Sequence, residues 1–331
     1  MRSQLAIVGA LAALLVAAAP ALAGNGGFGP VPAESPNAEG ISDSYWFITV
    51  FIVAIFLLVE SLLIAFLIRF RRARRARTAD GAQIHGSSRL ETMWTVGPVL
   101  ILFAVAVFVF AKLPGIQDVP TATAGQPNLV VEVTGQQYFW EFRYPNGVVS
   151  IDRLRAPQGR TVELKVTAPE WDVIHSWWIP ALGGKIDAIP GTVNTTWFRA
   201  DDTGVYEGQC AELCALYHAK MLAAVEVVPA ATFDTWLEDQ RASQTAGTSS
   251  LGEESFEGAC AKCHGLAGEG GYGPKLDGNA LVNDPAALEK LLRNGRAIPG
   301  RGVMPPVGRD WDAEQMRAAT DYLRERFGSG S

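Results

Sequence analysis

Cys210-Ala-Glu-Leu-Cys214-Ala-Leu-Tyr-His218-Ala-Lys-Met221 places two thiols, an imidazole and a thioether within twelve residues. Thiolate and thioether ligands beside imidazole suit copper, and a single blue-copper site needs one cysteine, with histidine and a weak axial methionine. Because this stretch has two cysteines, we expect the two thiolates to bridge two copper ions and to share an unpaired electron between them. Each copper then needs one terminal imidazole, and His175, in WDVIHSWWIP, is the expected second one.

The same residue types allow a second interpretation. Two cysteines and two histidines are also the ligands of a structural zinc site. The thioether and the soft thiolates favour copper, but this stretch alone leaves both metals open. The rest of the chain strengthens the copper interpretation.

The chain is long enough for two or three modules, with 331 residues. Residues 1–23 carry Arg2, then an Ala/Leu/Val run, then Ala-Leu-Ala, which is typical of a secretory signal peptide cleaved after Ala23. An additional membrane helix is the alternative, but the apolar run is short and Pro20 lies at its end. The four cysteines fall in two metal motifs, which leaves none for a structural disulfide.

Residues 24–112 contain two apolar runs, at about 45–68 and 93–112, each long enough to span a bilayer. The segment RFRRARRAR between them has six arginines from Arg69 to Arg77, which marks the cytoplasmic side. The runs therefore predict a two-helix hairpin in a membrane, in contact with lipid and with both ends on the exported side. Everything from residue 113 onward is then periplasmic or extracellular.

The exported part is acidic, with 19 basic and 28 acidic side chains in residues 113–331. This balance argues against a nucleic-acid partner and suits a basic protein partner. From 129 to 228 the pattern changes to short β-rich runs separated by turn signals, which predicts a β-sandwich. The copper stretch falls between two of these runs, so we expect it in a loop at one end of the sandwich.

The C-terminal residues carry a second metal motif, Cys260-Ala-Lys-Cys263-His264, which is the C-x-x-C-H pattern of c-type haem attachment. The two thiols would form thioethers and His264 would be the proximal iron ligand. Met304 is the expected sixth ligand, because Met316 lies within a helical pattern and suits the core. Helices are predicted over 253–264, 285–294 and 312–327, with Asp312 as an N-cap. A redox dithiol or half a zinc site is the alternative reading of C-x-x-C.

With these motifs the chain resembles cytochrome c oxidase subunit II, in the bacterial type with a fused C-terminal cytochrome c domain. The resemblance covers nearly the whole chain. It implies a multidomain architecture of transmembrane hairpin, cupredoxin-like β-sandwich and small all-α cytochrome c domain. The expected boundaries are 24–112 for the N-terminal segment and hairpin, 113–230 for the copper domain, 231–252 for a polar linker and 253–331 for the cytochrome c domain.

The resemblance also assigns roles to single residues. It implies a dinuclear copper A centre held by His175, Cys210, Glu212 through its backbone carbonyl, Cys214, His218 and Met221. The carboxylate of Glu212 is expected to face a magnesium ion at the boundary with subunit I, and KIDAIPG, with Asp187, resembles the segment near that boundary.

Two further roles are implied for residues outside the copper stretch. Glu91, in LETMWT, matches the mouth of a proton channel, and a snorkelling residue at the membrane edge is the alternative. The family's aromatic stretch usually reads Q-W-x-W, whereas this chain has Gln137-Tyr138-Phe139-Trp140. Tyr138 and Trp140 are the candidates for electron uptake, and the tyrosine makes the usual route doubtful.

The expected function is electron delivery in a respiratory terminal oxidase. Electrons from cytochrome c or another donor would pass through haem c and the copper pair to subunit I, where oxygen reduction is coupled to proton pumping. Subunit III is a further expected partner, and no catalytic oxygen site is expected in this chain. The alternative is a membrane-anchored copper carrier or assembly factor with a haem domain.

Overall fold

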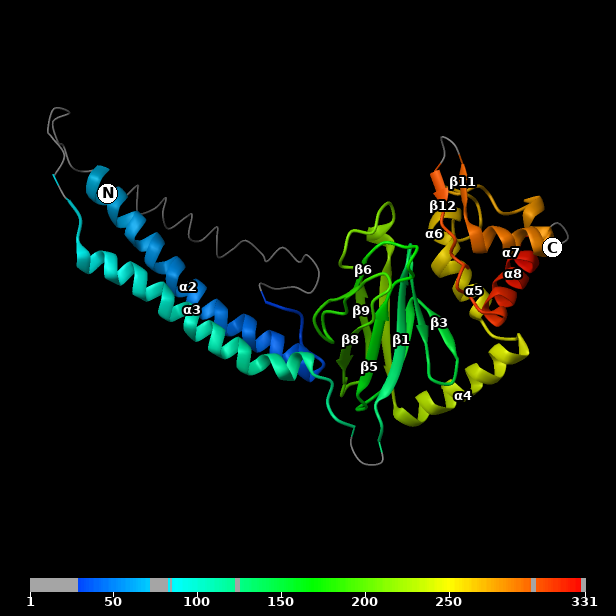
Figure 1. Ribbon diagram of the computed structural model, residues 1–331, viewed down its shortest axis with the longest axis horizontal. Coiled ribbons are helices and arrows are strands. Elements are labelled where there is room, and N and C mark those ends of the chain that lie inside the picture. Colours follow the sequence, from blue (N-terminus) through cyan, green and yellow to red (C-terminus); the bar gives the residue numbers. More distant parts are fainter. Residues whose placement is uncertain (1–28, 72–82, 84, 123–125, 299–301, 329–331) are drawn as a thin grey trace, which may run out of the picture. The chain divides into compact units, whose positions relative to one another are not determined.

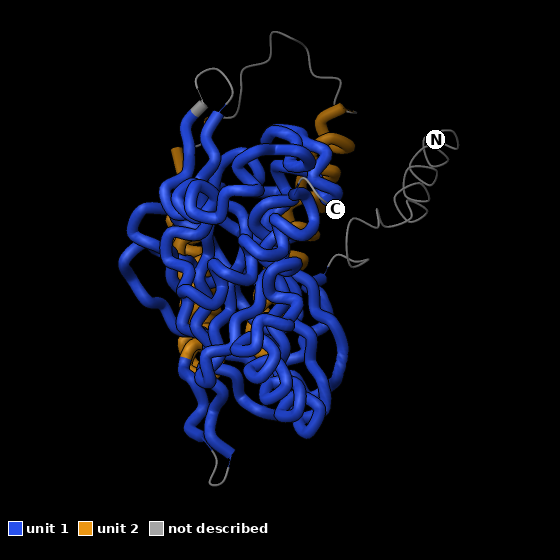
Figure 2. Tube along the Cα trace, turned by 90° about the vertical axis from the view of Figure 1, so that its right-hand side faces the viewer, with its two compact units in different colours: residues 1–38, 118–331 blue, residues 39–117 orange. Residues whose placement is uncertain are grey.

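The computed structural model describes residues 29–71, 83, 85–122, 126–298 and 302–328. The predicted signal peptide with its cleavage site, and the arginines from 72 to 77, lie outside the described residues. The chain divides into two compact units, residues 39–117 and a larger one formed by residues 1–38 and 118–331 (Figure 2).

The smaller unit consists of two long helices, α2 (Pro36–Arg71) and α3 (Ser88–Gln117). Both are long and apolar enough to cross a membrane, and they contain the two predicted spans. They run side by side, because the rings of Phe47 and Phe108 stack at 4.0 Å and Lys112 pairs with Asp43 at 2.7 Å (Figure 1). None of the described residues of α3 is buried, so this apolar surface needs lipid or another subunit to cover it.

The first part of the larger unit is a sandwich of two main sheets (Figure 1). The larger sheet has the order β3-β2-β1-β5-β8, formed by β3 (Val149–Ile151), β2 (Phe139–Arg143), β1 (Leu129–Gln136), β5 (Val162–Thr167) and β8 (Asn194–Phe198). The smaller sheet has the order β4-β10-β9, formed by β4 (Arg153–Pro157), β10 (Leu222–Val228) and β9 (Gly204–Gln209). A separate two-stranded sheet pairs β6 (His175–Trp177) with β7 (Ile186–Ala188).

The strands bury one face each, as period-2 patterning predicts. In β5 the side chains of Val162, Leu164 and Val166 are buried, and those of Glu163 and Lys165 between them are partly exposed. The buried faces of the two sheets form one apolar core. This confirms the predicted β-sandwich and holds the loops at its ends in place.

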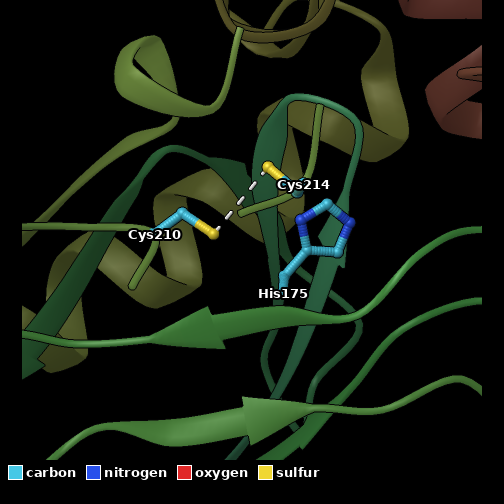
Figure 3. Close-up of side chains that lie close together, drawn as sticks. All are labelled: His175, Cys210 and Cys214. Carbon is cyan, nitrogen blue, oxygen red and sulfur yellow. Dashed lines mark hydrogen bonds between the residues drawn. The ribbon is translucent and has the colours of Figure 1, made fainter. Parts of the chain in front are cut away.

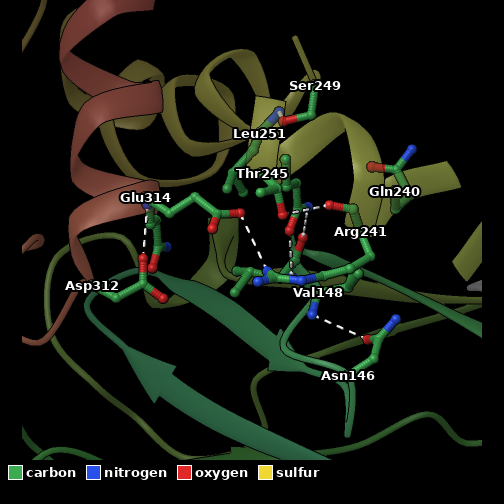
Figure 4. Close-up of polar contacts among 12 residues, drawn as sticks. Asn146, Val148, Gln240, Arg241, Thr245, Ser249, Leu251, Asp312 and Glu314 are labelled. Carbon is green, nitrogen blue, oxygen red and sulfur yellow. Dashed lines mark hydrogen bonds and ion pairs between the residues drawn. The ribbon is translucent and has the colours of Figure 1, made fainter. Parts of the chain in front are cut away.

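Helix α4 (Ala230–Ala246) follows the sandwich and differs from the expected linker over 231–252. The segment is polar in composition, but its helix-forming residues build a helix of 17 residues, and buried Phe233 packs into the sandwich core. Near its other end, Gln244 is buried and bonds to both backbone groups of Val149. Arg241 approaches Glu314 with 3.4 Å between Nη1 and Oε1 (Figure 4).

The C-terminal part is a small helical domain. Its elements are α5 (Leu251–Ser255), the π-helical turn η2 (Phe256–Cys260), α6 (Ala261–His264), the 3₁₀ turn η3 (Ala280–Asn283), α7 (Pro285–Asn294), the hairpin β11 (Arg296–Ile298) and β12 (Gly302–Met304), and α8 (Ala313–Phe327). The three predicted helices are confirmed, the first of them divided by the π turn. Asp312 caps α8, with its carboxylate accepting the N–H of Gln315 at 2.8 Å. The hairpin was not predicted.

Candidate functional site

The loop between β9 and β10 carries the cysteine-rich stretch, as predicted. Its ends are joined, because the Cys210 N–H donates to the Met221 carbonyl at 2.9 Å. The next residue, Ala211, donates its N–H to the Ser176 carbonyl at 2.9 Å. Since Ser176 follows His175 in β6, this bond fixes the loop against the strand that carries the expected upstream imidazole.

Three expected ligands meet inside this loop. His175, Cys210 and Cys214 are buried, and their ligand atoms lie within 4.8 Å of one another (Figure 3). The two sulfur atoms are 3.9 Å apart and form no disulfide. Because a metal–thiolate bond is about 2.3 Å long, two sulfurs at this separation can contact the same metal ion.

The other expected ligands lie against these two sulfurs. His218 Nδ1 is 3.6 Å and Met221 Sδ is 3.8 Å from Cys214 Sγ. The backbone oxygen of Glu212 is 3.2 Å from Cys210 Sγ. All six atoms named from the sequence are therefore brought together at one end of the sandwich.

The environment of His175 fits a metal ligand. The ring is fully buried, and neither of its nitrogens has a hydrogen-bond partner among the described residues. Asp172 Oδ1 lies 3.6 Å from Nε2, which is too long for a hydrogen bond. A buried polar atom without a partner costs about 1–3 kcal/mol, and a metal ion would satisfy one of these two nitrogens.

The two thiols influence each other's ionisation. The hydrogen bond with Cys214 lowers the pKa of Cys210, and the same contact raises the pKa of Cys214. The thiolate is the form that binds metals. The Cys210 sulfur is therefore ready to bind a cation as a thiolate. The Cys214 thiol loses its proton when a metal ion takes the place of that proton.

Glu212 and Asp187 flank a lysine. Lys185 Nζ is 3.2 Å from Asp187 Oδ1 and 4.0 Å from Glu212 Oε2. The hydroxyl of Ser176 donates to the same Asp187 oxygen at 2.8 Å, and this bond and the lysine lower the pKa of Asp187. A magnesium ion at the Glu212 carboxylate would compete with the Lys185 ammonium group for this carboxylate. Nothing in the sequence indicated this lysine contact.

A second site lies in the helical domain. A cavity of about 670 Å³ is lined by Cys260, Cys263 and His264 together with Met304. Most of its remaining lining is apolar, from residues such as Leu276, Leu288, Leu291, Leu292 and Val307. A volume of this order with an apolar lining is that of a pocket for a large organic cofactor.

The two expected iron ligands differ in their surroundings. His264 Nδ1 is 2.7 Å from the Pro274 carbonyl, a bond that fixes the ring and leaves Nε2 for a metal. Met304 is half-buried at the end of β12 and lines the cavity. Met316 is buried in α8, belongs to the apolar core and is not among the cavity-lining residues.

The two aromatic candidates for electron uptake occupy different positions. Tyr138 lines the haem-sized cavity, and its ring meets that of Tyr217 in the copper loop at 5.6 Å. Trp140 is fully buried, with its ring 6.2 Å from that of His175. Of the two residues, Tyr138 is partly exposed and Trp140 is buried.

Glu91 lies in the first turn of α3. Its carboxylate is exposed in this chain and accepts the N–H of Ser87 at 3.3 Å. This contact is that of a residue at a helix start, and the channel role stays a prediction. His85, in the segment between the two helices, is exposed.

Sequence reasoning missed Gln137, the neighbour of Tyr138. Gln137 lines the cavity, and its amide Nε2 donates to the Cys214 carbonyl at 2.9 Å. A glutamine carries no metal-binding signature, so only its position next to the aromatic stretch could have indicated it.

Comparisons with known proteins match all three parts of the chain. Residues 23–111 match the family model of the cytochrome c oxidase subunit II transmembrane domain, and residues 148–228 match that of its periplasmic domain. Residues 248–323 match the model described as cytochrome c oxidase, cbb3-type, subunit III.

Curated relatives extend over most of the chain. It is 32% identical over 311 residues to cytochrome c oxidase subunit 2 of Alkalihalophilus pseudofirmus, an alignment that covers 88% of each chain. It is 33% identical over 284 residues to the same subunit of Bacillus sp. strain PS3, covering 77% of this chain and 79% of the relative. Among solved structures, the periplasmic domain of cytochrome oxidase subunit II from Bradyrhizobium japonicum is 35% identical, covering 37% of this chain and 96% of its own, with a TM-score of 0.34. The length and identity of the curated alignments establish that the chain belongs to the cytochrome c oxidase subunit II family, with a cytochrome c domain at its C-terminus.

Proposed function

We propose that this chain delivers single electrons to the oxygen-reducing subunit of a haem-copper respiratory oxidase. The observation that carries the proposal is that the buried copper-type ligands and the haem-sized pocket with its C-x-x-C-H motif lie in the same compact unit. Electrons come from cytochrome c or another donor outside the membrane. Oxygen reduction and proton pumping take place with subunit I.

The copper loop is suited to hold two ions without moving. Cys210 and Cys214 would bridge them, His175 and His218 would be terminal ligands, and Met221 and the carbonyl of Glu212 would complete the set. Copper in such a site supplies one-electron redox chemistry. The hydrogen bonds at both ends of the loop keep its ligands in place, and electron transfer is fast where ligands barely rearrange.

The helical domain is suited to hold a covalent haem. Cys260 and Cys263 would form the thioethers, and His264 and Met304 would occupy the two axial positions. Histidine–methionine ligation raises the reduction potential of haem iron. With His264 and Met304 both bound to the iron, the domain would transfer electrons rather than bind oxygen.

The hairpin anchors both sites at a membrane. We propose the bacterial plasma membrane, with the sandwich and the helical domain on the periplasmic or extracellular side. The exposed apolar faces of α2 and α3 suit lipid together with subunits I and III. Glu91 would take part in proton uptake, and Glu212 would hold magnesium at the subunit I boundary after displacing Lys185.

A copper carrier or assembly factor is the competing function. A carrier needs ligands that are exposed and exchange readily, whereas His175, Cys210, Cys214 and Met221 are buried. Copper that leaves the purified chain within minutes in the presence of a weak chelator would favour the carrier. Retained copper favours electron transfer.

Metal analysis of the purified full chain tests the proposal directly. Two copper ions and one covalent haem per chain are expected, together with a near-infrared absorption band from the mixed-valence copper pair. Zinc at the loop, or a single copper ion, would refute the dinuclear assignment.

A further inference from the structure

The helical domain contacts the sandwich directly through an apolar cluster. Phe139, Val149 and Ile151 of the larger sheet are buried in the same cluster as Phe256 and Leu251 of the helical domain. A Cβ at Gly258, in the π turn, would collide with the Ile151 side chain. Glycine therefore fits this position, where any larger residue would meet the Ile151 side chain.

Polar contacts surround this apolar cluster. Lys262, between the two haem-attachment cysteines, donates to Asp152 Oδ2 at 2.6 Å and to the Tyr138 carbonyl at 2.7 Å. Gln315 Nε2 in α8 donates to Glu141 Oε2 in β2 at 3.0 Å. These contacts join residues that are more than 100 positions apart in the sequence, and they hold the helical domain in one place on the sandwich.

This arrangement makes two sandwich residues part of the haem pocket. Gln137 and Tyr138 line the same cavity as Cys260, Cys263 and Met304. The Lys262 bond to the Tyr138 carbonyl holds this backbone segment against the haem-attachment helix. The pocket is therefore completed by the domain that carries the copper ligands.

Gln137 reaches from this pocket wall to the copper loop. Its Nε2 donates to the carbonyl of Cys214, an expected bridging ligand, at 2.9 Å. Its own backbone N–H is held by Asp172 Oδ2 at 2.9 Å, so the residue is bonded at both ends. The Gln137 side chain thus connects a residue of the haem-pocket wall with the backbone of Cys214, an expected copper ligand.

We infer that Gln137 is the positioning residue that couples the haem pocket to the copper centre: it lines the pocket and holds the Cys214 carbonyl in place. The inference rests on the proposed function. The transfer that it supports moves one electron from iron(II), which becomes iron(III), to the oxidised copper pair, which becomes reduced by one electron. No bond breaks and no proton is transferred. A through-bond path across one hydrogen bond is more effective than an open gap of the same length.

A second path is available through the aromatic rings. Tyr138 also lines the pocket, and its ring meets Tyr217 of the copper loop edge-on at 5.6 Å. Within the described part of the chain, the rings of Tyr138 and Tyr217 are in contact but form no hydrogen bond with each other. We place the coupling at Gln137 because its bond ends on the backbone of a ligand.

The test compares Gln137→Met with Gln158→Met in the full chain loaded with copper and haem. Methionine keeps the length of the side chain and removes the amide. Gln158 is the matched control, because its Nε2 also donates to a backbone carbonyl, that of Asp201 at 2.7 Å, away from the copper loop. The electron-transfer rate from haem to copper is measured after photoreduction of the haem, without oxygen or partner subunits. The copper electron paramagnetic resonance spectrum is recorded on the same samples.

Gln137→Met is expected to slow this transfer about tenfold or more, corresponding to about 1.4 kcal/mol in the barrier, and to change the copper spectrum. Gln158→Met is expected to change neither. An unchanged rate in Gln137→Met with both cofactors bound would overturn the inference, as would a loss of rate in Tyr138→Leu alone. If Gln137→Met does not retain copper, Gln137→Asn, which keeps the amide and shortens its reach, is measured in its place with the same expectation.

The failure of the proposed function would look different. In that case the unsubstituted chain would lack either the copper pair or the covalent haem, and no transfer between them would be seen in any variant.

Discussion

Lys262 Nζ lies 2.6 Å from Asp152 Oδ2 and joins the haem-attachment helix to the sandwich. Only 14% of the lysine side chain and 27% of the aspartate side chain are exposed. Burial raises the pKa of Asp152, and the charge of Lys262 opposes that effect. The other carboxylate oxygen of Asp152 accepts the Trp140 N–H at 2.8 Å, so that the ion pair connects the haem domain to strand β2.

Removing one partner of this pair is expected to be destabilising. Lys262→Met leaves the Asp152 carboxylate largely buried without its cation, and breaking a buried pair in this way costs about 3–5 kcal/mol. Because Asp152 is partly exposed, we expect about 2–3 kcal/mol in the free energy of unfolding. Urea unfolding of the full chain, followed by tryptophan fluorescence, measures this difference.

Lys275→Met is the matched control for Lys262→Met. Lys275 pairs with Asp277 at the same 2.6 Å, but both side chains are mostly exposed, at 60% and 64%. An exposed pair contributes about 0–1 kcal/mol. Equal effects of the two substitutions would show that the Lys262 pair does not hold the domains together. Asp152→Asn, added to Lys262→Met, is expected to recover part of the loss.

The stability of the domain contact is expected to depend on pH through Glu141. Burial raises the pKa of this carboxyl above its usual value near 4.5, although bonds from Gln315 and Arg143 lower it and the nearby Asp312 raises it further. A group with a raised pKa binds its proton more tightly in the folded state, so stability is fully present below about pH 4.5 and is lost as pH rises through the raised pKa.

Glu141→Gln removes this titration and keeps an oxygen to accept the bond from Gln315. The urea midpoint of this variant is expected to fall less with rising pH than that of the unsubstituted chain. Glu163→Gln, on β5, is the control, because Glu163 pairs with Lys165 within its own strand. A pH dependence that is the same in all three chains would contradict the role of Glu141.

Local signals in the sequence were sufficient for many elements. The Asp312 cap and the helix from 313 to 327 could be predicted because capping and apolar periodicity act within a few residues. The copper loop could be predicted because two thiols, an imidazole and a thioether at such short spacing have few other uses. The haem-attachment motif is informative for the same reason.

Contacts between distant residues could not be predicted in this way. Nothing in the sequence around Gln137 shows that it reaches Cys214, which is 77 positions away. Helix α4 was taken for a linker because its composition is polar, and its burial depends on where Phe233 and Gln244 meet the sandwich. The β11–β12 hairpin depends in the same way on its cross-strand bonds.

The bridging role of the cysteines can be tested by spectroscopy. Cys214→Ser replaces one of the two sulfurs, 3.9 Å apart, with a harder and smaller oxygen. The near-infrared band of the mixed-valence pair is expected to disappear, and the copper content is expected to fall below two ions per chain. Haem content serves as the internal control, since Cys260 and Cys263 are unchanged. Survival of the band in Cys214→Ser would show that this sulfur does not bridge two metals.

The axial role of Met304 predicts a change in ligand access at the haem. Met304→Ala removes a thioether from the lining of the cavity that also holds His264, and it would leave the iron without its proposed second protein ligand. Carbon monoxide is expected to bind the reduced haem of this variant and not that of the unsubstituted chain, as seen in the Soret band. The reduction potential is expected to fall as well, because methionine ligation raises it. Met316→Leu is the control. Met316 lies in α8 and is buried in the apolar core, and the substitution replaces its thioether by a side chain of similar size. Carbon monoxide binding to Met316→Leu but not to Met304→Ala would assign the sixth ligand to Met316.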